Sequence, residues 1–235
     1  MKTIGLVGGM DWESSAEYYR IINEAVRQKL GKRHSAKCVM YSVDFEELEL
    51  LEAHAKWKET ATFLTQAIRY LVKGGAEFFI LCNSHMHYVA DEIQTAVDIP
   101  FLHIADATAA QIKYQNILRV GLIGSRFIME EKFYRGRLEE QHHLEVLIPR
   151  VEARNRIHRV IYEEILGGSI RSSSKAEYLW IINELVAVGA QGLILGAPEI
   201  NLLISPRDVS IPVFDSTLLH ARAAVDYALN RVMEV

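Results

Sequence analysis

The fold of this chain is decided by two stretches, Gly75-Ala-Glu-Phe-Phe-Ile-Leu-Cys-Asn83-Ser-His-Met-His87 and Gly189-Ala-Gln-Gly-Leu-Ile-Leu-Gly-Ala197-Pro-Glu-Ile200. Each begins with Gly-Ala, continues as a short apolar run and ends in polar residues. An apolar run of this length after a glycine is typical of a buried parallel strand, with the polar residues at its carboxyl end. We therefore expect both stretches to deliver side chains into a crevice.

The sequence repeats itself at a nearly constant distance. The two Gly-Ala starts lie 189 − 75 = 114 residues apart. Two other glycine-bearing strand patterns, Ile4-Gly-Leu-Val-Gly-Gly9 and Val120-Gly-Leu-Ile-Gly124, lie 121 − 5 = 116 residues apart. The pattern Ile99-Pro-Phe-Leu-His-Ile104, itself a predicted strand, returns 112 residues later as Ile211-Pro-Val-Phe-Asp215. Three pairs in the same order predict two similar halves, in which Asn83 and Ala197 occupy matching positions.

Amphipathic patterns between these strands predict helices, which include residues 46–58, 88–95, 127–141, 156–166 and 217–233. Ser174-Lys-Ala-Glu177 has the spacing of a capping box, and His142-His143 is predicted to be a solvated turn. Alternating strands and helices predict the α/β class, here as two pseudo-symmetric lobes, each with a doubly wound, mainly parallel sheet, and a site in the cleft between them. The expected first lobe is 1–104 and the second is 105–212, with 213–235 packing back onto the first.

Composition excludes several classes of partner. The chain has 235 residues and a formal charge of −4, which gives no electrostatic reason to expect a nucleic acid or an anionic membrane. No apolar run is long enough to span a bilayer, and Met1-Lys2 leads into a strand without a signal-peptide pattern, so a cytoplasmic protein is expected. In that compartment Cys38 and Cys82 are expected to be free thiols.

The sequence resembles a known family at Gly8-Gly9-Met10-Asp11-Trp12-Glu13-Ser14-Ser15. This is similar to the opening signature Gly-Gly-Met-Ser-Trp-Glu-Ser-Thr of the aspartate racemases, within the Asp/Glu racemase family. The likeness continues almost to the end of the chain, in Ser42-Val-Asp-Phe45, Phe101-Leu-His-Ile-Ala-Asp106, Phe133-Tyr-Arg-Gly-Arg-Leu138, Gly196-Ala-Pro-Glu-Ile200 and Pro212-Val-Phe-Asp215. The resemblance implies a two-lobed, often dimeric protein that inverts the α-carbon of an amino acid without pyridoxal phosphate or metal.

The family's chemistry rests on two thiols, one from each lobe, in motifs of the form Cys-Asn-Thr and Gly-Cys-Thr-Glu. Here Ala197 occupies the second cysteine position and Pro198 the threonine position, and the internal offset puts Asn83 opposite Ala197. Cys82 pairs with Gly196, one residue early, and strand alternation turns its side chain away from the crevice. An amide and a methyl group cannot exchange a proton with carbon, so the two-thiol mechanism is not available.

Other residues are candidates for proton transfer or binding. His85 and Glu199 each lie two residues past a substituted position, although each also has a purely structural reading, and Cys82 is either a displaced base or an inert buried thiol. The substrate-binding candidates are Gly9, Met10, Asp11, Glu52, Ser84 and Pro198. Asp11 and Glu52 add negative charge where neutral residues are expected, which opposes a dicarboxylate unless a cation such as Lys56 pairs with it. Cys82-x-x-His85-x-His87 supplies ligands from one segment only, so no metal site is predicted.

Three functions follow as alternatives. The first is a cofactor-independent amino-acid racemase whose activity is altered or lost through Asn83 and Ala197. The second is a non-catalytic protein that binds a small amino or carboxylic acid, and the third is a decarboxylase or lyase, since a carbanion need only be protonated on one face. The expected partners are a small amino acid or related carboxylic acid and a second copy of the chain, with no nucleic acid and no membrane.

Overall fold

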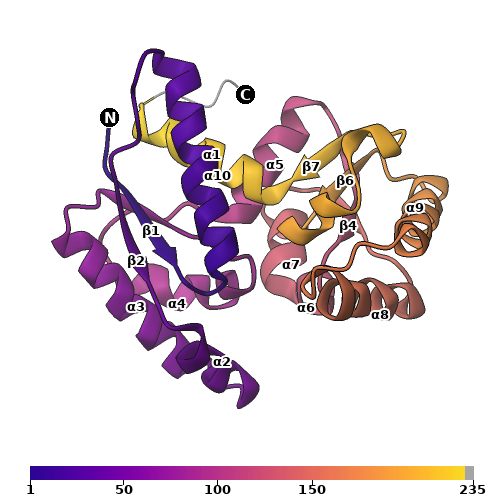
Figure 1. Ribbon diagram of the computed structural model, residues 1–235, viewed down its shortest axis with the longest axis horizontal. Coiled ribbons are helices and arrows are strands. Elements are labelled where there is room, and N and C mark those ends of the chain that lie inside the picture. The colour runs from indigo at the N-terminus through magenta and orange to yellow at the C-terminus, as the bar shows by residue number, and fades with distance from the viewer. Residues whose placement is uncertain (231–235) are drawn as a thin grey trace. The chain divides into compact units, whose positions relative to one another are not determined.

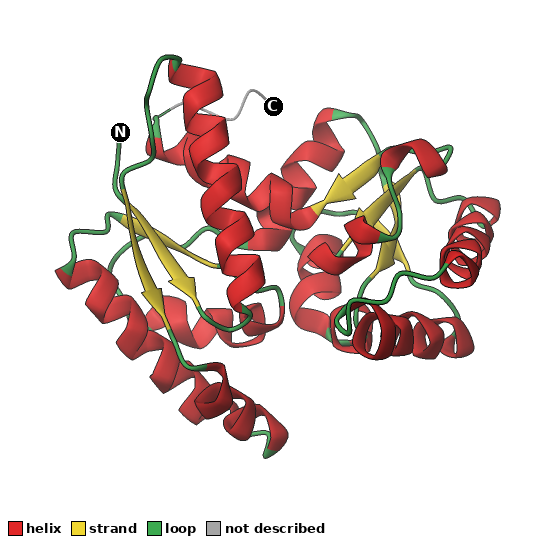
Figure 2. Cartoon of the chain, viewed as in Figure 1, coloured by secondary structure: helices red, strands yellow, loops and turns green. Residues whose placement is uncertain are grey.

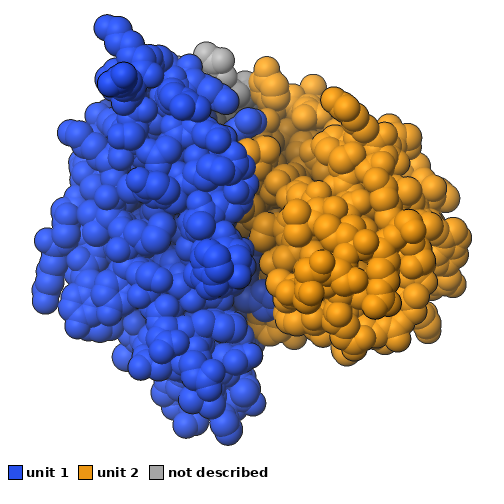
Figure 3. Space-filling view, viewed as in Figure 1, with its two compact units in different colours: residues 1–103, 220–234 blue, residues 104–219, 235 orange. Residues whose placement is uncertain are grey.

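The computed structural model describes residues 1–230 and divides into two compact units. Unit 1 contains residues 1–103 and, of the described residues, 220–230, and unit 2 contains Ile104–Leu219 (Figure 3). Both units are mixed α/β with parallel sheets, which confirms the predicted fold class. The sequence-based boundary at 212/213 and the structural boundary at Leu219/His220 differ by 219 − 212 = 7 residues, and residues 231–235 of the expected C-terminal segment lie outside the described part.

Unit 1 is built on three parallel strands in the order β2-β1-β3. The strands are β1 (Ile4–Gly8), β2 (Cys38–Ser42) and β3 (Phe78–Leu81). Its helices are α1 (Trp12–Leu30), α2 (Phe45–Ala53), α3 (Trp57–Lys73), the 3₁₀ turn η1 (His85–Val89), α4 (Ala90–Thr95) and most of α10 (Ser216–Ala228) (Figures 1 and 2). Every residue of β1 and β3 is buried, as expected of strands covered on both faces.

Unit 2 is built on four parallel strands in the order β5-β4-β6-β7. The strands are β4 (Arg119–Ile123), β5 (Glu145–Leu147), β6 (Gly192–Leu195) and β7 (Val213–Asp215). Its helices and helical turns are α5 (Ile104–Tyr114), α6 (Arg126–Glu130), α7 (Lys132–Glu140), α8 (Val151–Val160), the π turn η2 (Ile161–Ile165), α9 (Ser172–Ala187) and the 3₁₀ turns η3 (Pro198–Leu202) and η4 (Pro206–Asp208).

Strand glycines show where helices pack against the two sheets. A Cβ on Gly5 would lie 3.2 Å from Leu71 Cδ1 of α3, whereas a Cβ on Gly8 would lie 2.8 Å from Ser15 Oγ of α1. Residues 5 and 8 point to opposite faces of a strand, so α3 and α1 cover opposite faces of the unit 1 sheet. In unit 2 a Cβ on Gly121 would lie 3.0 Å from Leu185 of α9. Gly121 lies 116 residues after Gly5, and Leu185 lies 114 residues after Leu71. The repeated glycine therefore packs against a leucine at the matching position of each unit.

The strand registers repeat in the same way. Ile4 pairs with Phe78 in unit 1, and Val120 pairs with Gly192 in unit 2, at offsets of 116 and 114. A single parallel bridge joins Phe79 to Phe101, and its counterpart is the pairing of Leu193 with Val213. The two halves inferred from the sequence therefore share one strand order and one register.

Several local predictions were wrong. Residues 99–104 form only the isolated bridge at Phe101, and Ile104 already begins α5. The helix expected over 127–141 is two helices, because Glu131 has an extended backbone (φ −80°, ψ 151°). The helix expected over 46–58 is likewise interrupted, between α2 and α3.

Two other predictions failed wholly or in part because long-range partners override local patterns. Ser174 does not cap a helix: α9 already begins at Ser172, and the Ser174 hydroxyl donates a 2.6 Å hydrogen bond to Glu164 of the π turn. The turn at His142-His143 is present and His143 is exposed, but His142 is not fully solvated, since its Nε2 lies 2.7 Å from an Asp106 carboxylate oxygen that also accepts from Arg137. Within residues 1–230 no helix is long and apolar enough to cross a membrane.

Candidate functional site

The turn after β1 is fixed by the start of α1. Gly9 has φ +88°, and a Cβ there would lie 2.2 Å from the Val43 carbonyl oxygen, so only glycine fits. Its N–H donates a 2.9 Å hydrogen bond to Ser15 Oγ, and the Ser15 hydroxyl donates in turn to the Asp11 carbonyl oxygen. Because Val43 N–H donates to the Gly8 carbonyl oxygen, the chain leaving β2 is held against the same turn.

Asp11 and Met10, both predicted to bind substrate, have structural contacts of their own. The Asp11 carboxylate caps α1, accepting hydrogen bonds from the Glu13 N–H at 3.2 Å and from the Ser14 hydroxyl. Met10 is 1% exposed and belongs to the core of unit 1. The side chain of Asp11 therefore stabilises the helix start, and that of Met10 packs beneath the turn.

The turn after β3 carries Cys82, Asn83, Ser84 and His85. Cys82 is completely buried, and burial together with the neighbouring Cys38 raises the pKa of its thiol far above its usual value. Asn83 Oδ1 accepts a 3.2 Å hydrogen bond from the Met86 N–H, so its amide closes the 3₁₀ turn η1. Ser84 is buried, whereas His85 is half-buried.

A cluster of buried histidines lies behind this turn within unit 1. His87, His103 and His220 are 1%, 4% and 0% exposed, and the His87 ring centroid lies 4.6 Å from that of His103 and 5.5 Å from that of His220. A carbonyl oxygen can only accept, so His87 Nδ1 donates to Asn83 O and His220 Nε2 donates to Leu102 O, each at 2.9 Å. His87 therefore holds the backbone of Asn83 in the turn after β3.

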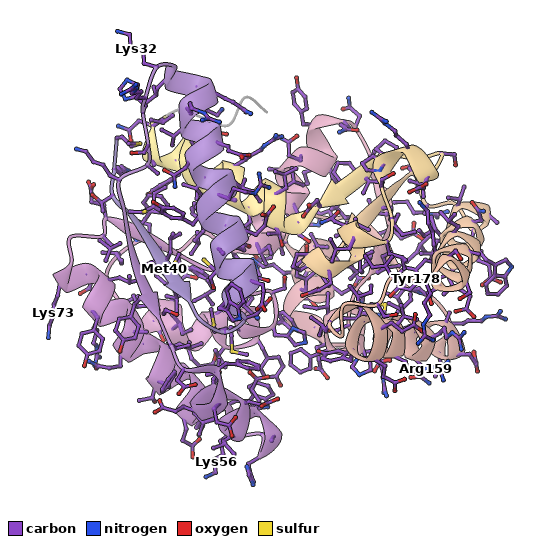
Figure 4. All side chains as sticks on the ribbon, in the orientation of Figure 1. Lys32, Met40, Lys56, Lys73, Arg159 and Tyr178 are labelled. Atoms are coloured by element: carbon purple, nitrogen blue, oxygen red, sulfur yellow. The ribbon has the colours of Figure 1, made fainter. Side chains whose placement is uncertain are left out.

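The turn after β6 carries Ala197, Pro198 and Glu199. Ala197 is extended and 9% exposed, and Pro198 opens η3, whose first hydrogen bond runs from the Ile200 N–H to the Ala197 carbonyl oxygen at 3.3 Å. Glu199 is half-buried. Burial, followed by the negative charges of Glu164 and Glu199, raises the pKa of Tyr178 on α9 (labelled in Figure 4).

Backbone hydrogen bonds make Asn83 and Ala197 equivalent. The last paired residues are Leu81 in β3 and Leu195 in β6. One residue later, the Cys82 N–H donates to Val7 O at 2.9 Å and the Gly196 N–H donates to Ile123 O at 2.8 Å. The pairing therefore continues through Cys82 and Gly196 at offsets of 114 and 116, and Asn83 and Ala197 are the first residues beyond it in their respective units.

Glu52 differs from the other candidates because one of its carboxylate oxygens, Oε1, is shielded from solvent and has no hydrogen-bond partner among the described residues. Burial, and secondarily the charge of Glu49, raises the pKa of Glu52 to about 7. Lys56, proposed from sequence as a neutralising cation, is exposed at the junction of α2 and α3 (Figure 4), and no ion pair joins it to Glu52.

Within unit 1 the structure brings the Gly9 turn and the Asn83 turn to the same edge of the sheet, because β1 and β3 are adjacent and parallel. Ala197, Pro198 and Glu199 gather at the corresponding edge of the unit 2 sheet. Sequence reasoning did not foresee the hydrogen bond between Gly9 and Ser15 or the burial of His103 and His220. The available signal was a serine only six residues after the glycine turn. Among residues 1–230, no group of three or more His, Cys, Asp or Glu side chains is arranged to hold a metal ion.

Comparison with known proteins places this geometry in a family. The model of the Asp/Glu/hydantoin racemase family matches residues 7–224. The chain belongs to this family. A Yersinia pestis protein classed with the Asp/Glu racemases is 50% identical, with a TM-score of 0.96 over 97% of this chain and 100% of that one. An aspartate racemase homologue from Pyrococcus horikoshii OT3 is 32% identical, with a TM-score of 0.88 over the same shares.

More distant racemases share the fold alone. The Picrophilus torridus aspartate racemase is 21% identical to this racemase-family chain, with a TM-score of 0.74 over 97% of this chain and 94% of that one. A Francisella tularensis glutamate racemase, solved in complex with D-glutamate, is 14% identical, with a TM-score of 0.66 over 97% of this chain and 81% of that one. The resemblance inferred from the motifs is thus confirmed.

Proposed function

We propose that this protein binds an amino acid and acts at its α-carbon, with a proton-transfer pair that is altered or lost. The observation that carries the proposal is the register that makes Asn83 and Ala197 equivalent, each one residue past the paired part of its strand. An α-hydrogen is a very weak acid, so inversion requires one group to remove it and another to return a proton on the opposite face. Neither an amide nor a methyl group can serve as that base.

The ionisable groups next to Asn83 and Ala197 are the candidates for proton transfer in an altered enzyme. Cys82 is completely buried and its pKa is raised, so its thiolate is disfavoured as a base. His85 and Glu199 each lie two residues beyond a substituted position (85 − 83 = 199 − 197 = 2), and both are half-buried. We propose these two as the replacement acid–base pair of the altered enzyme.

A second function, a non-catalytic binder of a small amino or carboxylic acid, is favoured by the same two substitutions. Asn83 closes η1 through its own amide, and Ala197 has no polar side-chain atom. The turns at Asn83 and Ala197 are thus both formed without a side chain at these positions that could transfer a proton. A site that retains its frame but lacks its bases would bind ligand without turning it over.

Incubation with each amino acid in heavy water separates the alternatives. Deuterium at the α-carbon, detected by proton NMR, supports α-carbon chemistry, whereas release of carbon dioxide supports a decarboxylase. A ligand-dependent rise in melting temperature without either reaction supports the binder. If His85 and Glu199 are the pair, His85→Asn and Glu199→Gln each lower exchange at least tenfold.

Restoring the thiols tests the assignment of the two positions. The double variant Asn83→Cys, Ala197→Cys is expected to gain racemisation beyond either single variant, because inversion needs a group on each face of the α-carbon. Cys82→Ser is the matched control and is expected to change nothing in exchange, since that thiol is buried. A folded double variant that binds aspartate and shows no gain would contradict the assignment.

We further propose, from the family resemblance, that the protein works in the cytoplasm in amino-acid metabolism and assembles as a homodimer. Light scattering of the purified chain tests the assembly, with a mass near twice 26.7 kDa expected.

A further inference from the structure

Glu52 lies on the inner face of α2. It follows Leu48 by four residues, so the two side chains lie one above the other on the same side of the helix. Leu48 is completely buried and packs in one core cluster with Met10 and Met86. Met10 belongs to the turn after β1, and Met86 donates its N–H to the Asn83 side chain in the turn after β3. The face of α2 that carries Glu52 therefore adjoins the core cluster to which both turns of unit 1 contribute a methionine.

One oxygen of the Glu52 carboxylate lacks a hydrogen-bond donor. Its Oε1 atom is shielded from water and accepts no hydrogen bond from any described residue. A shielded acceptor without a donor is unfavourable, and a shielded charge without a counterion more so. Neither of its charged neighbours on the chain relieves this, because Glu49 is also acidic and Lys56 is exposed without an ion pair to Glu52. A donor from outside the chain would complete the site.

We propose that Glu52 determines substrate specificity: its shielded oxygen accepts a hydrogen bond from the ligand's side chain, so the protein selects amino acids whose side chains carry an ammonium, amide or hydroxyl group over dicarboxylates. This inference rests on the proposed function, because it places a residue in the same amino-acid site. A second ligand carboxylate has no proton to donate at neutral pH and repels Glu52. An ammonium group supplies a hydrogen-bond donor and also a positive charge that attracts the Glu52 carboxylate.

Affinities for ornithine, homoserine and aspartate, measured by calorimetry at pH 8, test this specificity. The wild-type chain is expected to bind ornithine and homoserine more tightly than aspartate. Glu52→Gln is expected to lower the ratio of ornithine to aspartate affinity at least tenfold, because glutamine removes the charge and offers its own N–H to a ligand carboxylate. Glu47→Gln, which removes the same charge from an exposed position of α2, is the matched control and is expected to leave the ratio unchanged.

A second measurement needs no variant. Since Glu52 has a pKa of about 7, an ammonium that binds it drives off the remaining proton, so ornithine binding at pH 7 is expected to release about half a proton. Calorimetry in two buffers of different ionisation heat measures this release. Aspartate is expected to release none.

The outcomes separate this inference from the proposed function. A wild-type chain that prefers aspartate, an affinity ratio unchanged by Glu52→Gln, or ornithine binding without proton release would overturn the role of Glu52 and leave the proposed function intact. A wild-type chain that neither binds nor exchanges any amino acid would overturn the proposed function, and the role of Glu52 with it.

Discussion

At the scale of single residues, Gly9 and Gly75 have nearly the same φ angle in different surroundings. Their φ values are +88° and +89°, both in the region that disfavours other residues. A Cβ on Gly9 would lie 2.2 Å from Val43 O and 2.5 Å from Val43 N, whereas a Cβ on Gly75 would meet nothing within 4 Å. Only at Gly9 does the cost of the conformation add to a clash with backbone that cannot move aside.

We therefore expect Gly9→Ala to lower the free energy of unfolding by about 2 kcal/mol or more, and Gly75→Ala by about 1 kcal/mol. Urea denaturation of both variants measures the difference. Equal losses would show that conformation alone decides the cost and that the chain leaving β2 yields readily.

At the scale of elements, a side-chain hydrogen bond joins the π turn η2 to the next helix, α9. Ser174 is 2% exposed, and its hydroxyl donates to Glu164 at 2.6 Å. Hydrogen bonds to a charged acceptor contribute more than neutral ones. Glu164 keeps a longer ion pair with Arg171 at 3.8 Å, so the loss of Ser174 does not leave it isolated.

Ser174→Ala is expected to destabilise the protein by about 1–2 kcal/mol. Ser173→Ala, an exposed position in the same turn of α9, is the control and is expected to change stability by less than about 0.5 kcal/mol. Thermal unfolding followed by circular dichroism compares them. If both variants melt together, the Ser174 hydrogen bond contributes nothing.

At the scale of the whole molecule, two carboxyl groups contribute to the pH dependence of stability in opposite senses. Burial of Asp106 is outweighed by hydrogen bonds from Arg137 and His142, and the pKa of Asp106 is lowered, so its contribution is present above the unfolded value near 4 and is lost as pH falls through the folded value. Glu52 acts in the opposite sense. Its folded pKa of about 7 lies above the ordinary 4.5, so stability present below pH 4.5 is lost as pH rises towards 7.

Glu52→Gln is therefore expected to raise the free energy of unfolding at pH 8 by about 1–2 kcal/mol, less than full linkage predicts because the carboxyl is partly exposed. The gain is expected to vanish near pH 4, where wild-type Glu52 is protonated in both states. Denaturation curves from pH 4 to 8 measure it, with Glu47→Gln as the exposed control. A gain that is the same at every pH would show that desolvation of the Glu52 charge is not its cause.

Much of this architecture follows from patterns in the chain. The glycine-bearing strands at offsets of 114 and 116 predicted two similar α/β units, and the observed registers repeat at those offsets. The same counting predicted that Asn83 matches Ala197. The predicted helix over 127–141 failed at Glu131 because amphipathic spacing does not report the backbone angles of one residue.

The sequence by itself determined the fold class, the internal repeat and the matching positions of Asn83 and Ala197, because period and spacing are properties of neighbouring residues. Only the tertiary structure decided which distant groups meet, such as His87 with His220, 133 residues apart, and Asp106 with His142. It also decided that Glu52 Oε1 finds no hydrogen-bond donor among the described residues. Burial and hydrogen-bond partners depend on how elements pack, and the same local pattern allows many packings.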